Sequence, residues 1–451
     1  MELSNIKQVY LVGIGGIGMS GLARYFNNRE CLVCGYDRTP TPLTDSLIKE
    51  GIDIVFEDDA EQIPDVFRTK NEATLVVFTP AIPGDSAIFN YFRSNDFDVK
   101  KRSQVLGIIS RGMFTIAVGG THGKTTTSSI IAHILKHSGY DCSAFLGGIA
   151  SNYNTNVLFG KNNVVVVEAD EYDRSFLTLH PDIAVITSMD ADHLDIYRDK
   201  EHLSESFRLF ASQVKEGGTL LYRQGLPLGD GLTYSANSDA DVKAAEVRIV
   251  DASFYFDFVS KDTLIKGIEL GIPGLHNVEN AVAATQVALQ LGITADKIKD
   301  ALKAFRGVKR RFEYIIKTDQ HIYIDDYAHH PEELRACITA VKSLYPERRL
   351  TVIFQPHLFT RTRDFADGFA EVLDLADELL MLDIYPAREL PIPGVTSDMI
   401  LQKMTISARS KVSKEEAVSI AEMLQPELLL TVGAGDIDTL IEPLKRVLED
   451  A

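Results

Sequence analysis

Residues 118–127 read Val-Gly-Gly-Thr-His-Gly-Lys-Thr-Thr-Thr, a glycine-rich turn that ends in Gly123-Lys124-Thr125. Such a turn supplies backbone N–H groups, one cation and one hydroxyl to a nucleotide polyphosphate and its Mg²⁺. A strand-like apolar run precedes it at 114–118 and a helix-like apolar run follows at 128–135, the context that a phosphate-binding loop requires. Val118 stands where the general spacing asks for Gly, so an ordinary turn before a helix is the alternative. The sequence predicts an ATP site in an α/β fold.

Length and charge narrow the class of protein. At roughly 150 residues per domain, a chain of 451 residues predicts about three domains. A net charge of −18 argues against non-specific nucleic-acid binding, which needs a basic surface. The N-terminal residues lack a basic segment followed by an apolar one, and the longest apolar runs are far too short to span a bilayer. We therefore expect a cytoplasmic protein with no membrane span and no nucleic-acid partner.

The four cysteines are too sparse for a disulfide framework. Cys31 and Cys34 form a C-x-x-C pair, but no second pair accompanies them and both fall in a strand-like run. Residues three apart on a strand point to opposite faces. We interpret these cysteines as structural rather than as a redox or metal pair.

Three segments each begin with a strand signal and a glycine turn. In the first, an apolar run at 9–12 leads into Gly13-Ile14-Gly15-Gly16-Ile17-Gly18, the G-x-G-x-x-G order with a helix pattern after it. A second strand at 31–36 ends at Asp37, where a dinucleotide-binding fold places its ribose-binding acid. Residues 1–108 are predicted to form a small open α/β sheet.

The second segment, 109–310, carries β-branched runs at 164–167 and 183–187, which suit strands buried on both faces of a parallel sheet. Alternating patterns within 217–270 predict added antiparallel strands. The third segment, 311–451, repeats the α/β pattern, with strand candidates at 322–324, 350–354, 378–382 and 428–432. The expected fold class is three α/β domains in series.

Polar groups follow the buried strands of the second segment. Glu168-Ala169-Asp170-Glu171 ends one strand, and carboxylates there face the crevice where open α/β sheets bind ligands. Glu168 and Thr125 are predicted Mg²⁺ ligands, with capping of the next helix as the alternative. His193, in the run 190–195, is predicted to join a second metal or to position the phosphoryl group. Of the three aspartates in that run, Asp190, Asp192 and Asp195, we expect two to be solvated loop residues.

Further polar groups occur later in the chain. Asn277 could pair with an adenine edge, although taken alone a helix N-cap is the better interpretation. His329-His330 is not interpreted as a zinc site, because adjacent histidines on a strand diverge and no thiolates accompany them. Arg361 and Arg363 follow a strand and could clamp a carboxylate, the alternative being a solvated basic helix start.

Together these motifs resemble the Mur ligase family of ATP-dependent amide-bond ligases of bacterial cell-wall synthesis. Seven motifs occur in the family's order across nearly the whole chain, and the family shows the same shortened phosphate loop. They are Gly-Ile-Gly-Gly-Ile-Gly-Met-Ser-Gly-Leu-Ala (13–23), Gly-Thr-His-Gly-Lys-Thr-Thr-Thr (120–127), Glu-Ala-Asp-Glu (168–171), Asp-His-Leu-Asp (192–195), His-Asn-Val-Glu-Asn (276–280), Asp-Asp-Tyr-Ala-His-His-Pro (325–331) and Phe-Gln-Pro-His (354–357).

The resemblance implies a Rossmann-like UDP-sugar-binding domain, a central P-loop ATPase-like domain with added antiparallel strands, and a Rossmann-like C-terminal domain that holds the amino acid. The implied reaction joins L-alanine to the lactyl carboxylate of UDP-N-acetylmuramate through an acyl phosphate. ATP and two Mg²⁺ ions are the implied cofactors. A monomer or weak homo-oligomer is expected.

The resemblance also assigns residues. Lys124, Glu168 and His193 are the implied catalytic groups, and Thr125, Glu168 and His193 the metal ligands. The others are Gly120, Thr121, His122, Gly123, Lys124, Thr125, Thr126, Asn277, Arg311 and Asp326 for ATP; Gly15, Gly16, Ile17, Gly18 and Asp37 for the UDP-sugar; and Tyr327, His329, His357 and Arg361 for the amino acid.

Three positions depart from the family pattern. Ser188 replaces an Asn, Leu358 replaces an Arg, and Thr79-Pro80-Ala81-Ile82 replaces Ser-Ser-Ala-Ile. Three other functions are alternatives: a murein-peptide recycling ligase of the same family, an NAD(P)-dependent dehydrogenase built on Gly13 to Gly18 and Asp37, and a non-catalytic ATP-binding regulator. The dehydrogenase leaves the phosphate loop and the motifs at Glu168 and His193 unexplained. The regulator predicts missing catalytic groups, whereas Lys124, Thr125, Glu168 and His193 are all present.

Overall fold

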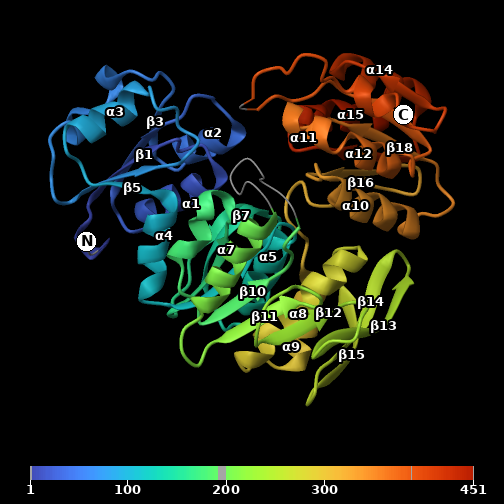
Figure 1. Cartoon of the computed structure of the whole chain (residues 1–451), viewed down its shortest axis with the longest axis horizontal. Helices are drawn as coiled ribbons and strands as arrows, with labels where there is room; N and C mark the ends of the chain where they lie inside the picture. Colours follow the sequence, from blue (N-terminus) through green and yellow to red (C-terminus); the bar gives the residue numbers. More distant parts are fainter. Residues whose placement is uncertain (1–2, 191–199, 388, 450–451) are drawn as a thin grey trace. The chain divides into compact units, whose positions relative to one another are not determined.

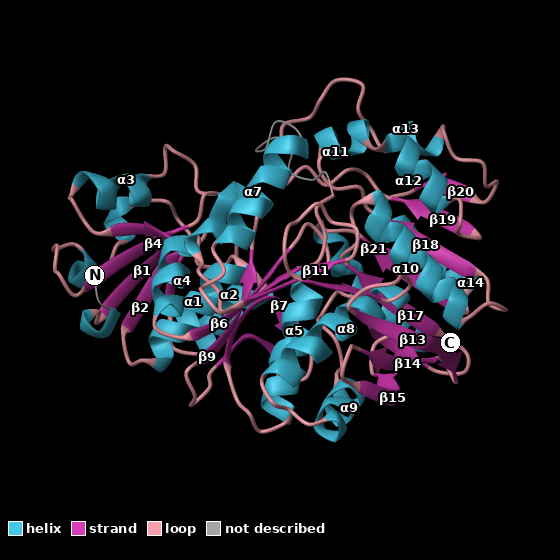
Figure 2. Cartoon of the chain, turned by 60° about the horizontal axis from the view of Figure 1, so that its bottom comes forward, coloured by secondary structure: helices cyan, strands magenta, loops and turns pink. Residues whose placement is uncertain are grey.

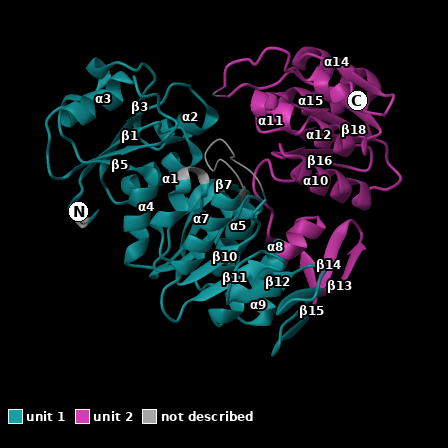
Figure 3. Ribbon diagram, in the orientation of Figure 1, with its two compact units in different colours: residues 1–244, 258–265, 280–302 teal, residues 245–257, 266–279, 303–451 magenta. Residues whose placement is uncertain are grey.

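The computed structural model describes residues 3–190, 200–387 and 389–449. In these ranges the strands form three sheets (Figure 1). Helices follow many of the strands, whereas the strands within 143–169 and within 219–270 succeed one another without a helix. Helices and strands both occur along the whole described chain (Figure 2), so the predicted α/β class is confirmed. The chain divides into two compact units (Figure 3). The first unit comprises residues 1–244, 258–265 and 280–302, and the second comprises residues 245–257, 266–279 and 303–451. The domain boundaries at 108 and 310 stay predictions.

The first sheet is parallel in its described pairings and has the order β3-β2-β1-β4-β5. Its central strand β1 is buried from Val9 to Val12, and the glycine turn follows directly. Cys31, directly before β2, and Cys34, on β2, belong to separate core clusters. The elements are β1 (Gln8–Val12), α1 (Ile17–Asn28), β2 (Leu32–Tyr36), α2 (Pro42–Lys49), β3 (Asp53–Val55), β4 (Thr74–Phe78), α3 (Ala87–Ser94), β5 (Val99–Lys101) and α4 (Arg102–Arg111).

The second sheet has the order β15-β14-β13-β12-β11-β10-β6-β9-β7-β8. β6 pairs in parallel with both β9 and β10. The carboxyl ends of these three strands therefore lie side by side, which brings the phosphate loop, Glu168 and Ser188 together. The elements are β6 (Phe114–Gly119), α5 (Lys124–His137), β7 (Ser143–Ala150), β8 (Thr155–Leu158), β9 (Val164–Ala169), β10 (Ile183–Ile186), α7 (Lys200–Ser212), β11 (Thr219–Arg223), β12 (Leu232–Ser235), β13 (Val242–Val250), β14 (Ser253–Val259), β15 (Leu264–Leu270), α8 (Leu275–Gln290) and α9 (Ala295–Ala304).

Strand direction differs from the expectation in part of this sheet. β11, β12 and β13 pair in parallel, where antiparallel strands were predicted. An alternating pattern reports one buried face of a strand and not the direction of its neighbour. β7 and β8 pair antiparallel in this sheet. β14, which carries the alternating run at 253–256, lies between β13 and β15.

The third sheet has the order β16-β17-β21-β18-β19-β20, parallel except for the pair β16 with β17. β17, β18 and β21 are fully buried, which matches three of the predicted apolar runs. The elements are β16 (Glu313–Lys317), β17 (Ile322–Asp326), α10 (Pro331–Leu344), β18 (Leu350–Phe354), α11 (Phe359–Asp364), α12 (Ala366–Leu373), β19 (Glu378–Met381), α13 (Asp398–Leu401), β20 (Arg409–Lys411), α14 (Lys414–Leu424), β21 (Leu428–Val432) and α15 (Ile441–Glu449).

Within the first unit, α1 packs on β7 and β8 of the second sheet. Asn156 on β8 accepts a hydrogen bond from Arg24 (2.7 Å) and donates to the hydroxyl of Ser20 (3.1 Å). Its amide also donates to the carbonyl of Ile17, at the start of α1. These bonds hold the glycine turn beside the second sheet. No helix in the described ranges combines the length and apolarity needed to cross a membrane.

Candidate active site

The phosphate loop depends on two glycines with positive φ. Gly120 has φ +141°, and a Cβ there would lie 2.1 Å from the hydroxyl of Thr187. Gly123 has φ +81° and is the N-cap of α5 without a side-chain cap. The N–H groups of the first helical turn therefore have no partner within α5, and they can bind an anion such as a phosphate.

Ser188, one of the three departures, bonds to this loop. Its hydroxyl accepts the N–H of His122 at 2.7 Å and lies 2.9 Å from the hydroxyl of Thr121. The N–H of Asp190 in turn donates to Thr121 Oγ1 at 3.0 Å, and the Asp190 carboxylate lies 3.9 Å from His122 Nε2. The end of β10 thus fixes the loop conformation, and a serine is enough to do so.

Lys124 is the cation of the loop. Its Nζ donates to the carbonyls of Gly120 (2.6 Å) and Thr121 (3.3 Å) and lies 3.0 and 2.8 Å from the two carboxylate oxygens of Glu171. Burial by itself would lower the pKa of Lys124, but Glu171, Glu168 and Asp170 together raise it. The ammonium therefore stays charged in the predicted phosphate-binding loop.

Glu168 lies on β9 and accepts the N–H of Gly147 at 2.9 Å. A Cβ at Gly147 would lie 2.2 Å from both carboxylate oxygens, so only glycine lets β7 approach this side chain. Thr125, the other predicted metal ligand, is buried at the start of α5. Thr126, also predicted for ATP, lies next to it and is buried as well. His193 lies outside the described residues.

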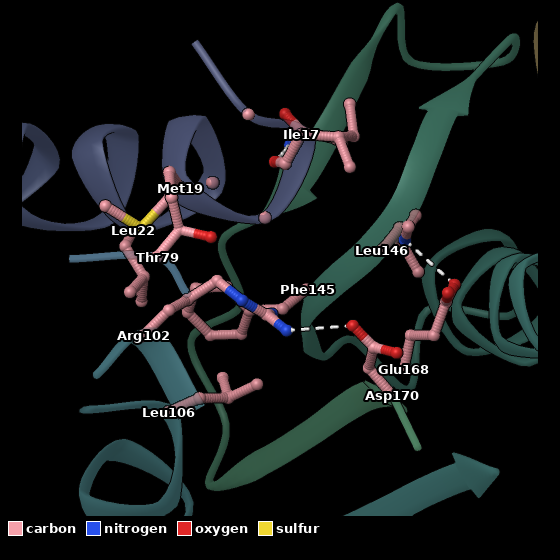
Figure 4. Close-up of a pocket in the computed structure, with 15 residues that line it drawn as sticks. Ile17, Met19, Leu22, Thr79, Arg102, Leu106, Phe145, Leu146, Glu168 and Asp170 are labelled. Carbon is pink, nitrogen blue, oxygen red and sulfur yellow. Dashed lines mark hydrogen bonds and ion pairs between the residues drawn. The ribbon is translucent and has the colours of Figure 1, made fainter. Parts of the chain in front are cut away.

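A cavity of about 240 Å³ opens between the glycine turn and the second sheet (Figure 4). Gly16, Ile17 and Gly18 line one side, and Glu168 and Asp170 line another. Arg102 reaches into it and pairs with Asp170, Nη2 to Oδ2 at 3.2 Å (Figure 4). The cavity joins the predicted UDP-sugar residues to the predicted metal ligand.

Gly15 and Asp37 bond to each other instead of lining the cavity. Asp37 Oδ2 accepts the N–H of Gly15 at 2.7 Å, and Oδ1 accepts the N–H of Thr39 at 3.1 Å. A Cβ at Gly15 would lie 2.8 Å from that carboxylate. Asp37 thereby shapes the turn, since both of its oxygens already accept backbone N–H groups.

In the second unit, the predicted amino-acid-binding residues lie together. The ring of His329 lies 5.4 Å from that of Tyr327 and 5.8 Å from that of His357. Arg361 Nη1 lies 3.3 Å from His357 Nδ1, and Arg361 is buried. Burial, to which Arg361 adds and which Glu333 opposes, lowers the pKa of His329 to about 4. This cluster therefore presents a guanidinium beside a neutral imidazole.

Leu358, the second departure, begins α11 from a buried position with φ +70°. Its N–H donates to the carbonyl of Tyr385 at 3.0 Å. Tyr385 also stacks on His357, with ring centroids 5.8 Å apart. Position 358 therefore sets the backbone around His357 and Arg361 without adding a charge.

Asn277, Arg311 and Asp326 also belong to the second unit. The N-cap interpretation of Asn277 is wrong, because the residue lies inside α8 and its side chain donates to the carbonyl of Pro273 at 2.6 Å. Burial raises the pKa of Asp326 to about 6 against the effect of Arg311. Asp326 accepts the N–H groups of Phe312 and Ala328 at 2.6 and 2.7 Å.

Sequence reasoning did not assign roles to three residues of the first unit: Glu171, Arg102 and Ser188. Each acts through a side chain 47 to 68 positions away, as the pairs Lys124–Glu171 and Arg102–Asp170 show. Glu171 is the last residue of the Glu-Ala-Asp-Glu motif at 168–171, so its position after a buried strand could have indicated a role in the site. Arg102 and Ser188 carried no comparable local signal of their role.

Family models match three successive regions of the chain. They are the Mur ligase family catalytic domain at 8–113, the Mur ligase middle domain at 118–288, and the glutamate ligase domain of Mur ligases at 310–435.

Relatives match over the full length. A UDP-N-acetylmuramate–L-alanine ligase of Flavobacterium johnsoniae is 50% identical over 450 residues, 100% of both chains, and one of Parabacteroides distasonis is 49% identical over 99% of this chain and 98% of its own. The solved UDP-N-acetylmuramate–alanine ligase of Thermotoga maritima aligns with a TM-score of 0.81 at 28% identity, over 98% of both chains. A murein peptide ligase of Psychrobacter arcticus shares the fold, with a TM-score of 0.70 at 22% identity over 99% of both chains. With all three regions matched in order, the chain belongs to the Mur ligase family.

Proposed function

We propose that this protein joins L-alanine to the lactyl carboxylate of UDP-N-acetylmuramate, converting ATP to ADP and phosphate. The observation that carries the proposal is the full-length identity of 50% and 49% to relatives that bear the name of this activity. The geometry around Lys124 and the Arg361 cluster supports it. We expect the protein to act in the cytoplasm, where ATP is available.

In the first step, an oxygen of the lactyl carboxylate attacks the γ-phosphorus of ATP, and the bond to the ADP oxygen breaks. Lys124 and the N–H groups at the start of α5 would hold the β- and γ-phosphates and offset the charge that shifts between them. Gly120, Thr121, His122 and Gly123 would contribute as the loop that presents these groups. The product of this step is an acyl phosphate.

In the second step, the amine of alanine attacks the acyl carbon, the bond from that carbon to the phosphate oxygen breaks, and the amine gives its proton to water as phosphate leaves. Arg361 would bind the alanine carboxylate through its guanidinium. Nδ1 of His329 lies 2.9 Å from the carbonyl of Tyr327, which favours the tautomer with Nδ1 protonated. Nε2 is then an acceptor that can orient the amine.

The remaining substrate contacts are part of the same proposal. Gly16, Ile17 and Gly18 would bind the UDP-sugar through backbone N–H groups, with Gly15 and Asp37 shaping the turn. Asn277, Arg311 and Asp326 would contact the adenine and ribose of ATP.

The residues present fit Mg²⁺. No three His, Cys, Asp or Glu side chains gather as a metal site in the described ranges. Mg²⁺ commonly binds one or two protein oxygens and completes its shell with phosphate oxygens and water, which suits Glu168 and Thr125. When bound, the ion would neutralise phosphate charge. We propose His193 as the residue associated with a second ion.

Phosphate release from ATP tests the proposal directly. The purified protein is given ATP, Mg²⁺ and UDP-N-acetylmuramate, and receives L-alanine, D-glutamate or a murein tripeptide in separate reactions. We expect release that requires both the UDP-sugar and L-alanine. Release only with the tripeptide would assign the protein to the recycling activity instead, and no release in any reaction would contradict a ligase.

Gly147→Ala is expected to lower kcat by ~10–100-fold, because the new Cβ displaces the Glu168 carboxylate. Glu168 lies on a strand that stays folded, so the thermal midpoint should change little. Phosphate release is measured across a range of Mg²⁺ concentrations, with higher Mg²⁺ expected to restore part of the rate. Gly112→Ala, where a Cβ meets open space, is the control and should behave as wild type. A wild-type Mg²⁺ dependence in Gly147→Ala would remove Glu168 from the metal site.

A further inference from the structure

We propose that Arg102 recognises the diphosphate of the UDP-sugar and so determines specificity for nucleoside diphosphates over uncharged nucleosides. The inference rests on the proposed function, since it concerns the UDP-sugar cavity. It adds a cationic side chain to a UDP-sugar site for which only the glycine turn and Asp37 were predicted.

The guanidinium of Arg102 lies against the glycine turn. A Cβ at Gly18 would lie 2.8 Å from Nη1 and 3.1 Å from Cζ of Arg102. Glycine at position 18 therefore leaves the space that the guanidinium uses. Arg102 and Gly18 both line the cavity, as Figure 4 shows for the arginine.

The glycine turn also leaves backbone donors at the same place. Gly16 caps α1 without a side-chain hydrogen bond, and the first turn of α1 carries no acidic residue. The first N–H groups of a helix have no acceptor within the helix. A guanidinium beside them makes one side of the cavity positive, which suits a diphosphate and not a neutral sugar or base.

Helix stability does not account for a cation at this position. Arg102 is the first residue of α4, whose first turn has no acidic residue. A positive charge at a helix N-terminus opposes the helix dipole. Among the described residues the hydrogen-bond partner of the guanidinium is Asp170, which bonds to Nη2 alone. Nε and Nη1 are then available for phosphate oxygens, which match the planar donor geometry of arginine.

A substitution of Asp170 can distinguish a ligand-binding role of Arg102 from a purely structural role of the Arg102–Asp170 ion pair. Its side chain is 38% exposed and it ties the end of β9 to the start of α4. If the ion pair only held these elements together, removing either partner would have the same effect. If Arg102 binds the diphosphate, removing Asp170 takes away a competing anion and leaves the cation in place.

The experiment compares uridine, UMP and UDP as ligands of the full-length protein, by titration calorimetry for tight ligands and by ligand-observed NMR for weak ones. Arg102→Ala is expected to weaken UDP binding at least ~10-fold and to leave uridine binding unchanged, the loss typical of charge-assisted hydrogen bonds. Arg102→Lys should recover part of the loss, because it keeps the charge but not the fork. Asp170→Asn should bind UDP as tightly as wild type or more tightly.

Three results would overturn the assignment of Arg102 while leaving the proposed function intact. The first two concern Arg102→Ala: equal weakening of uridine binding and UDP binding, or no weakening of either. The third is a loss of UDP affinity in Asp170→Asn that matches Arg102→Ala, which would make the pair a structural tie. Wild-type protein that binds neither UDP nor UDP-N-acetylmuramate would contradict the proposed function itself, and the inference with it. Thermal midpoints of all variants show whether each protein is folded.

Discussion

Lys124→Ala is expected to abolish turnover, with kcat for phosphate release falling at least ~10²–10³-fold. Lys124 is the cation of the phosphate loop, and Glu171, Glu168 and Asp170 hold its pKa above the ordinary value. Without the ammonium, the loop offers only N–H groups and a hydroxyl to the transferring phosphoryl group. Measurement of phosphate release at saturating ATP gives the change in kcat directly.

The same substitution is also expected to cost stability. The Lys124 side chain is 14% exposed and that of Glu171 is 1% exposed, so removing the lysine takes the ammonium away from a buried carboxylate. Breaking such a pair costs about 3–5 kcal/mol of unfolding free energy. Lys124→Met combined with Glu171→Gln removes both charges and should recover most of that stability while staying inactive.

This pair of variants separates catalysis from folding. Denaturant unfolding reports the free energy of unfolding, and phosphate release reports kcat. Lys136→Ala, on the same helix, removes a lysine that pairs with Asp141 and should keep nearly wild-type activity. A wild-type kcat in either Lys124 variant would disprove the assignment of this loop as the ATP site.

Local patterns were sufficient for the elements that carry the site. The apolar run at 164–167 predicted a buried strand, and β9 has Val165, Val166 and Val167 at 0% exposure. The loop at 118–127 joins β6 to α5 as predicted. The family resemblance predicted four amino-acid-binding residues, and the fold brings these four, Tyr327, His329, His357 and Arg361, together.

What the sequence could not predict depends on distant pairs and on direction. The Lys124–Glu171 and Arg102–Asp170 pairs join residues 47 and 68 positions apart, so no local pattern reports them. The parallel pairing of β11 with β12 is set by the sheet and not by alternation within either strand. Asn277 was misread as a cap because Gly274, with φ +109°, turns the chain just before α8 begins.

Arg361→Ala is expected to raise the KM for L-alanine by ~10²-fold and to change the KM for ATP by less than about twofold. The estimate corresponds to the loss of charge-assisted hydrogen bonds from one guanidinium to a carboxylate. Arg361 is buried beside His357, in a cluster in which His329 is neutral, whereas Arg310 and Arg311 lie over the ring of Tyr327. Because the His329 imidazole is neutral, it cannot replace the positive charge that Arg361 presents to the carboxylate.

Arg363→Ala is the matched control. Arg363 lies on the same helix α11, is about half exposed and pairs with Asp364, so its loss should leave both KM values unchanged. Arg361→Lys should give an intermediate alanine KM, because an ammonium keeps the charge without the bidentate geometry. Parallel increases in the alanine and ATP KM values would exclude Arg361 as the carboxylate clamp, since a clamp on alanine has no reason to affect ATP.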